Sequence, residues 1–130
     1  MNASETIEAY YEALRAGEPL GPFFAPDTDR SVVKFGISER LAGTDAVRAG
    51  LRAQTETTMD WTVDSRALRV TEREGYAWFS DDVVLCWTDT EGTVRHEYET
   101  RWSGTLEATG GAREWQFVGM HVSTAESIEG

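Results

Sequence analysis

A few side chains in this sequence have the chemistry for acid–base or covalent work. Tyr10 and Tyr11 are adjacent phenols that could donate a proton, and Lys34 is the only lysine in the chain. An amine of this kind can pair with an anion or form a Schiff base with a carbonyl compound. The alternative for Lys34 is a surface side chain whose stem lies along apolar neighbours.

A second group of candidates lies in the C-terminal third of the chain. Residues 94–106 have strand-like composition, so alternate residues face opposite sides, and Glu99 and Arg101 share one side. They could bind an anionic group together, or they could belong to an exposed ion-pair ladder that stabilises little. His121 could transfer protons near neutral pH, or it could be a hydrogen-bonded structural residue.

Aromatic residues are frequent, with five tryptophans in 130 residues. Trp61 and Trp78 fall on predicted strands, where they could line a pocket for a flat or hydrophobic ligand, fill the core or form a dimer interface. Two distant histidines and one cysteine give no metal-ligand spacing, and no glycine-rich phosphate loop occurs. We therefore expect neither a metal nor a cofactor.

The elements that position these side chains follow from periodicity and turn signals. Helices are predicted over residues 4–16, capped by Ser4, and from Thr44 as cap to about residue 57. A short strand is predicted over residues 31–35. Longer strands follow at residues 60–71, 75–88, 93–106 and 114–123, with turns at 72–75, 89–92 and 108–112. Helices first and an antiparallel meander afterwards predict one α+β domain over residues 1–130, with the helices on one face of the sheet.

Long strands curl, and helices across the open side of a curled sheet would form a cone around a cavity. The element order, the Phe35-Gly36 pair, the run LAGTDAVR at residues 41–48 and the segment 101–123 carry a family resemblance. With these features the chain resembles the nuclear transport factor 2-like superfamily, and within it the SnoaL-like and ketosteroid isomerase-like branch. The resemblance implies a cone with an internal cavity and a homodimer formed through the outer sheet face.

The resemblance also bears on chemistry. Aligned on the Gly43-Thr44 helix start, Lys34 stands where the isomerase has its catalytic aspartate. A lysine cannot replace that base unless burial strongly lowers its pKa, so steroid isomerisation is disfavoured. Relatives often point an arginine into the pocket from the place of Arg101, which makes Arg101 the first site candidate.

The sequence therefore predicts a SnoaL-like protein that binds a small hydrophobic or weakly anionic metabolite. The sequence leaves undecided whether the protein also has lyase, isomerase or cyclase activity. The catalytic candidates for such a reaction are Tyr10, Arg101 and His121. The alternative is a non-catalytic dimerisation or scaffold module with a vestigial pocket. The expected ligand-binding residues are Tyr10, Tyr11, Lys34, Trp61, Trp78, Glu99, Arg101 and His121.

The net charge limits the classes of partner that the protein can be expected to bind. Twenty-three acidic residues against 12 basic ones give a formal net charge of -11. Phosphates would be repelled, so nucleic-acid binding is not expected. A carboxylate-rich surface with one lysine is favoured in a salt-rich cytosol. With no apolar run of membrane length and no signal-peptide pattern, we expect a cytoplasmic protein of a high-salt organism that does not bind a membrane.

Overall fold

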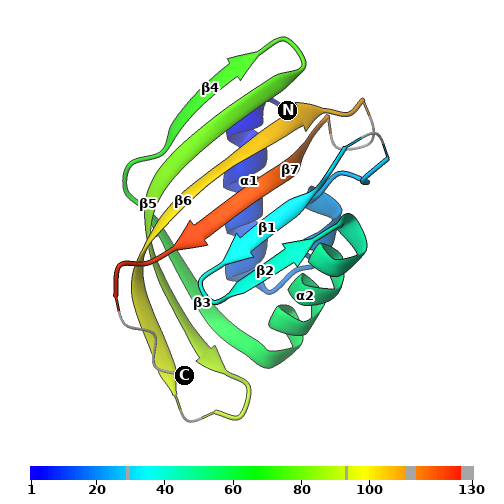
Figure 1. The fold of residues 1–130 in the computed structure, drawn as a ribbon. Coiled ribbons are helices and arrows are strands. Elements are labelled where there is room, and N and C mark those ends of the chain that lie inside the picture. The colour runs from blue at the N-terminus through cyan, green and yellow to red at the C-terminus, as the bar shows by residue number, and fades with distance from the viewer. Residues whose placement is uncertain (29, 93, 111–113, 127–130) are drawn as a thin grey trace.

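The computed structural model describes residues 1–28, 30–92, 94–110 and 114–126 of the chain. In these residues two α-helices and a short 3-10 helix pack with one curved sheet of seven strands, which confirms the predicted α+β class (Figure 1). The elements in chain order are α1 (Ala3–Ala16), η1 (Gly21–Phe23), β1 (Val33–Gly36), β2 (Glu39–Ala42), α2 (Thr44–Thr57), β3 (Thr58–Ser65), β4 (Arg69–Arg73), β5 (Tyr76–Asp89), β6 (Arg95–Ala108) and β7 (Trp115–Ser123).

The sheet runs in the order β2-β1-β7-β6-β5-β3, and β4 also pairs with β5. Its paired strands are antiparallel except β1 and β7, which are parallel. The long strands β5 and β6 bend across the molecule, with α1 on their concave side and α2 beside β1 and β2 (Figure 1). The predicted turn at 108–112 lies partly outside the described residues, but the strands on either side of it pair with each other.

Strands β3 and β4 correct the prediction of one strand over residues 60–71. Both pair with β5, β3 along residues 83–89 and β4 along residues 76–80, so the chain leaves the sheet between them. At this break the Asp81 carboxylate accepts a hydrogen bond from the backbone N–H of Ala67 at 3.0 Å. A side chain thus satisfies a donor that the interrupted ladder would leave unpaired.

The cap of the first helix lies two residues before the predicted one. Asn2, rather than Ser4, caps α1, because the Asn2 side chain accepts from the N–H of Glu5 at 2.8 Å. The Glu5 carboxylate accepts from the Asn2 N–H in return, which completes a capping box. Gly17 ends the helix with φ of 70°, a left-handed conformation that suits glycine.

The second helix also starts differently from the prediction. Gly43 is the cap residue of α2, and Thr44 is the first helical residue. The N–H of Thr44 donates to the Asp27 carboxylate at 3.2 Å, and its hydroxyl donates to the Ala25 carbonyl at 2.7 Å. The Asp27 carboxylate, from the loop before β1, thus supplies the missing cap and also interacts favourably with the positive end of the helix dipole. Neither helix of the described chain is long and apolar enough to cross a membrane.

The core lies between α1 and the middle of the sheet. Tyr10 of α1 packs edge-on against Phe117 of β7 and Trp102 of β6, with ring centroids 5.3 and 6.1 Å apart. Phe79 of β5 lies 5.9 Å from Phe117. Burial of each such ring contributes about 1.5–3 kcal/mol. Aromatic side chains therefore fill the centre of the concave face.

The first six residues of β6 lie at an edge of the sheet. β7 pairs with β6 only from Arg101 onward, so within the described chain residues 95–100 have a strand neighbour on one side alone. Side chains that follow β7 bond the backbone of Glu99 instead. Its N–H donates to the Glu126 carboxylate, and its carbonyl accepts from the Thr124 hydroxyl, each at 2.7 Å.

Candidate functional site

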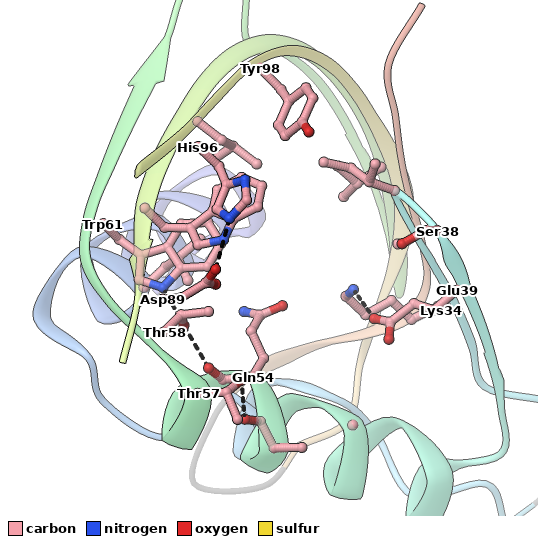
Figure 2. Close-up of a pocket in the computed structure, with 18 of the residues that line it drawn as sticks. Lys34, Ser38, Glu39, Gln54, Thr57, Thr58, Trp61, Asp89, His96 and Tyr98 are labelled. Atoms are coloured by element: carbon pink, nitrogen blue, oxygen red, sulfur yellow. Dashed lines mark hydrogen bonds and ion pairs between the residues drawn. The ribbon is translucent and has the colours of Figure 1, made fainter. Parts of the chain in front are cut away.

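A pocket of about 520 Å³ lies on the concave side of the sheet (Figure 2). Its walls come from β5 and β6 on one side and from β1 and the turn into β2 on the other, and the C-terminal half of α2 forms its base. This volume falls within the range of about 300–1,000 Å³ that is typical of small-molecule sites. Among the described residues, no cluster of three or more His, Cys, Asp or Glu side chains could hold a metal ion. The polar lining residues are Lys34, Ser38, Glu39, Gln54, Thr57, Thr58, Asp89, His96 and Tyr98.

One wall of the pocket is a row of aromatic rings. Trp61 of β3 stacks on Trp87 of β5 with 4.8 Å between ring centroids, and Trp87 stacks with His96 of β6 at 5.1 Å. Tyr98 continues the row, 5.6 Å from Trp87. The indole N–H of Trp61 donates to the Thr58 hydroxyl at 2.8 Å, which fixes the ring. A wall of this kind suits a flat or apolar ligand.

The same wall carries an acid–base pair. Nε2 of His96 lies 3.0 Å from Oδ2 of Asp89, and both residues line the pocket. They stand on paired strands beside the β5–β6 turn, where the Asp89 N–H donates to the Val94 carbonyl at 3.2 Å. The His96 side chain is 20% exposed and that of Asp89 is 44% exposed, so the carboxylate lies toward solvent. A carboxylate placed in this way can accept the Nε2 proton of the imidazole, which fixes the tautomer and the orientation of the ring.

The opposite wall carries Lys34. Its side chain is 6% exposed, its nitrogen turns into the pocket, and Nζ lies 3.4 Å from Oε1 of Glu39 (Figure 2). Burial lowers the pKa of Lys34, and the Glu39 carboxylate opposes this shift without cancelling it. A Cβ at Gly36 would lie 2.7 Å from Cγ of Glu39, so the glycine leaves room for Glu39 to reach back to the lysine. The alternative of a surface lysine is therefore excluded.

The two adjacent tyrosines of α1 face different surroundings. Tyr10 is buried and lines the pocket, and burial raises its pKa, with a smaller contribution from Glu39. Tyr11 does not line the pocket, and its hydroxyl donates to the Asp81 carboxylate at 2.8 Å. Burial, and then the hydrogen bond to Asp81, raise the pKa of Tyr11. Tyr11 therefore belongs to a structural cluster, contrary to its predicted role in ligand binding.

Two charged candidates lie on the convex side of β6. Glu99 and Arg101 are exposed there and border a second, outer groove, while His96 and Tyr98 of the same strand face the pocket. The expectation that Arg101 points into the cavity therefore requires correction. Alternation along β6 accounts for the placement, because residues of odd and even number leave the strand on opposite sides.

The remaining candidates divide between the pocket and the outer surface. Trp61 lines the pocket, as described above. Trp78 is 44% exposed and stacks with Tyr76, with centroids 6.0 Å apart. His121 is exposed and packs against Phe35 with the rings tilted and their centroids 5.5 Å apart. Trp78 and His121 therefore do not line the pocket, contrary to the sequence prediction.

Sequence reasoning missed several residues that do line it. Asp89, His96, Trp87 and Gln54 were not among the candidates, although the alternation of β6 had separated the faces correctly. The aromatic residues on the strand face that carries Tyr98 could have shown which face lines the pocket. In an antiparallel sheet covered on one side, the apolar face is the buried one. The pairing of Asp89 with His96 depends on the register of the hairpin, and a turn signal alone does not give it.

The fold and the site define a curved α+β protein with a polar-lined pocket beside its aromatic core. Residues 3–127 match the family described as SnoaL-like domain, and the chain therefore belongs to the SnoaL-like domain family. No curated protein sequence matches this chain significantly.

Solved structures support the same fold at low sequence identity. A candidate dehydratase of the nuclear transport factor 2-like family from Streptomyces avermitilis has a TM-score of 0.80 at 13% identity, over 95% of this chain and 94% of that one. A candidate scytalone dehydratase from Novosphingobium aromaticivorans has a TM-score of 0.80 at 14% identity, over 98% and 84%. A ketosteroid isomerase-like protein from Erwinia carotovora atroseptica has a TM-score of 0.75 at 15% identity, over 95% and 94%.

Proposed function

We propose that the pocket binds a small, flat, largely apolar organic molecule and that His96 transfers a proton on it. The observation that carries the proposal is the His96–Asp89 pair, with 3.0 Å between Nε2 and Oδ2, on the wall of a pocket lined by aromatic rings. The reaction class is a lyase, isomerase or cyclase step that begins with proton abstraction. The similarity to candidate dehydratases is consistent with this class.

The chemistry follows from the geometry of the pair. With the proton on Nε2 donated to Asp89, the other ring nitrogen of His96 has a free lone pair and can accept a proton from the ligand. Asp89 then stabilises the imidazolium that forms. The stack on Trp87 holds the ring plane, so the base is positioned before the ligand arrives. Tyr98, whose hydroxyl points into the pocket, is available to hydrogen-bond a ligand oxygen (Figure 2).

The test uses the two histidines as a matched pair. Flat ketones that bind the protein are incubated with it in deuterated water, and NMR follows the loss of their acidic C–H signals. We expect His96→Gln to slow this exchange by about 10²–10⁴-fold, the usual contribution of a general base. His121→Gln, on the outer surface, should exchange at the wild-type rate. Equal rates for His96→Gln and the wild type would overturn the proposal.

We also propose that the outer face of the sheet joins two copies of the chain, which is the assembly role kept as the alternative function. Tyr76 and Trp78 support it, since they are 49% and 44% exposed, stack on each other and lie beside Arg73, whose guanidinium is 5.4 Å from the Trp78 ring. Light scattering after gel filtration should give twice the chain mass for the wild type and a lower mass for Trp78→Glu. A monomeric wild type would exclude the dimer.

A further inference from the structure

The burial of Lys34 is not explained by its one ion pair. It is the only lysine, its side chain is 6% exposed, and it points into a pocket of about 520 Å³. A buried ammonium loses most of its hydration and needs close partners to compensate. Within the described chain, its nitrogen has a single hydrogen-bond partner, Oε1 of Glu39 at 3.4 Å, and the Glu39 side chain is 43% exposed.

The surroundings favour a neutral amine over an anion-binding ammonium. Burial is the main cause that lowers the pKa of Lys34. An anionic ligand would also approach the Glu39 carboxylate, which offsets the attraction of the ammonium. A neutral amine beside open space can instead act as a nucleophile, and carbonyl carbon is its usual target.

We propose that Lys34 captures a small aldehyde or ketone in this pocket as an imine. The ligand class is an uncharged carbonyl compound, with an aromatic or flat body that packs against Trp61 and Trp87. The inference shares its pocket with the proposed proton transfer but does not rest on it, since imine formation at Nζ does not require His96.

The reaction is balanced without an added oxidant or reductant. Nζ attacks the carbonyl carbon and forms a C–N bond, which gives a carbinolamine. The carbonyl oxygen then leaves as water with the two hydrogens of the amine, and the C=N bond remains. Glu39, at 3.4 Å, is placed to accept the proton that the nitrogen loses and to return it to the leaving oxygen.

The experiment traps the imine with cyanoborohydride and benzaldehyde, and peptide mass spectrometry locates the label. Besides Lys34, the chain offers only the Met1 amine, so the assignment is unambiguous. The same protein unfolded in urea supplies the matched reference for an ordinary lysine. At pH 7 we expect Lys34 to label faster in the folded protein, by up to about tenfold for each unit by which the pKa is lowered. Lys34 that stays unlabelled, or labels no faster than in the unfolded chain, would overturn the proposal.

Three variants separate this inference from the proposed function. Lys34→Arg keeps the charge and should give no label at position 34 while remaining folded by circular dichroism. Glu39→Gln removes a contact that raises the pKa of Lys34, so its labelling should reach half-maximum at lower pH. An unchanged midpoint would overturn the inference, since the reacting amine would not be the one beside Glu39. His96→Gln should lose proton exchange and keep labelling, so each proposal can fail alone.

Discussion

Asp81 and Lys34 both have ionisable side chains that the fold buries, with 4% and 5% exposed, yet their surroundings differ. The Asp81 carboxylate accepts hydrogen bonds from the Tyr11 hydroxyl at 2.8 Å, the Ser65 hydroxyl at 2.6 Å and the Ala67 N–H at 3.0 Å. Lys34 has one long contact with a half-exposed carboxylate and faces a pocket. Burial alone therefore does not mark a functional group. We propose that a functional group is marked by burial together with unused hydrogen-bonding capacity beside a pocket.

The largest effect should come from breaking the saturated cluster. Asp81→Ala leaves two hydroxyls and one backbone N–H without their acceptor, and each such loss costs about 1–3 kcal/mol. We expect the free energy of unfolding, measured in urea, to fall by about 3 kcal/mol or more. Asp82→Ala is the matched control, an exposed neighbour on the same strand, and should cost about 0.5 kcal/mol or less. Equal costs for the two variants would remove the contrast between Asp81 and Lys34.

A smaller effect should follow from removing one donor of the same cluster. Tyr11→Phe should cost about 1 kcal/mol, while Tyr76→Phe on the outer face should cost almost nothing. Because burial raises the pKa of Tyr11, the folded state favours the neutral phenol. This contribution is complete below the ordinary tyrosine pKa of about 10 and is lost as the pH rises above it. Urea titrations at pH 8 and pH 11 should therefore show the difference between wild type and Tyr11→Phe shrinking, and a constant difference would contradict the role of the hydroxyl.

Replacement of Lys34 should change the free energy of unfolding only slightly at neutral pH, although Lys34 is the only lysine of the chain and is buried. Lys34→Met does not disrupt a network of hydrogen bonds. We therefore expect the free energy of unfolding to change by no more than about 1 kcal/mol, in either direction. Because the folded-state pKa is lowered, the folded protein binds fewer protons than the unfolded chain. The penalty of burying Lys34 therefore decreases as the pH rises toward the ordinary lysine pKa of about 10.4.

Urea titrations across pH 7–10 test whether the penalty of burying Lys34 falls as the pH rises. The wild type should gain stability relative to Lys34→Met as the pH rises, whereas Lys34→Arg, which keeps its charge, should not. A wild type that loses stability relative to Lys34→Met over this range would mean that the fold stabilises the ammonium.

Salt should stabilise the whole protein but should not change the cost of replacing Asp81. We propose that the net charge of -11 reflects a salt-rich environment, so the wild type should be more stable in molar salt than in dilute buffer. Asp81→Ala should shift in parallel, with its difference from wild type constant to about 0.5 kcal/mol, because the cluster is buried. A circular dichroism melt that does not change between the two conditions would count against the proposal.

Much of the fold was accessible from the sequence, because helix periodicity, turn signals and element order act locally. The helices at residues 4–16 and 44–57 were predicted to within a residue or two. The break between β3 and β4 was not accessible, because it depends on Asp81, which lies more than ten residues further along the chain.

The site was accessible only in part. Tyr10, Lys34 and Trp61 line the pocket as predicted, whereas Arg101 was selected by resemblance and lies on the opposite face of its strand. Asp89 and His96 meet because thirteen paired positions join β5 and β6 in one register. Sequence alternation assigns residues to a face but does not say which face the helices cover.

The unpaired start of β6 bears on how the protein avoids aggregation. A bare strand edge invites another chain to add to the sheet, and natural proteins commonly block such edges. Here the Glu126 and Thr124 side chains occupy the N–H and the carbonyl of Glu99, the groups that an incoming strand would need. Exposed charged side chains, here Arg95 and Glu97, also lie along this edge, and charged residues are a common protection of edge strands. Thr124 and Glu126, which follow β7, thus protect this edge, so the long β5–β6 hairpin extends past β7 and carries the His96–Asp89 pair without adding a strand from another chain at this edge.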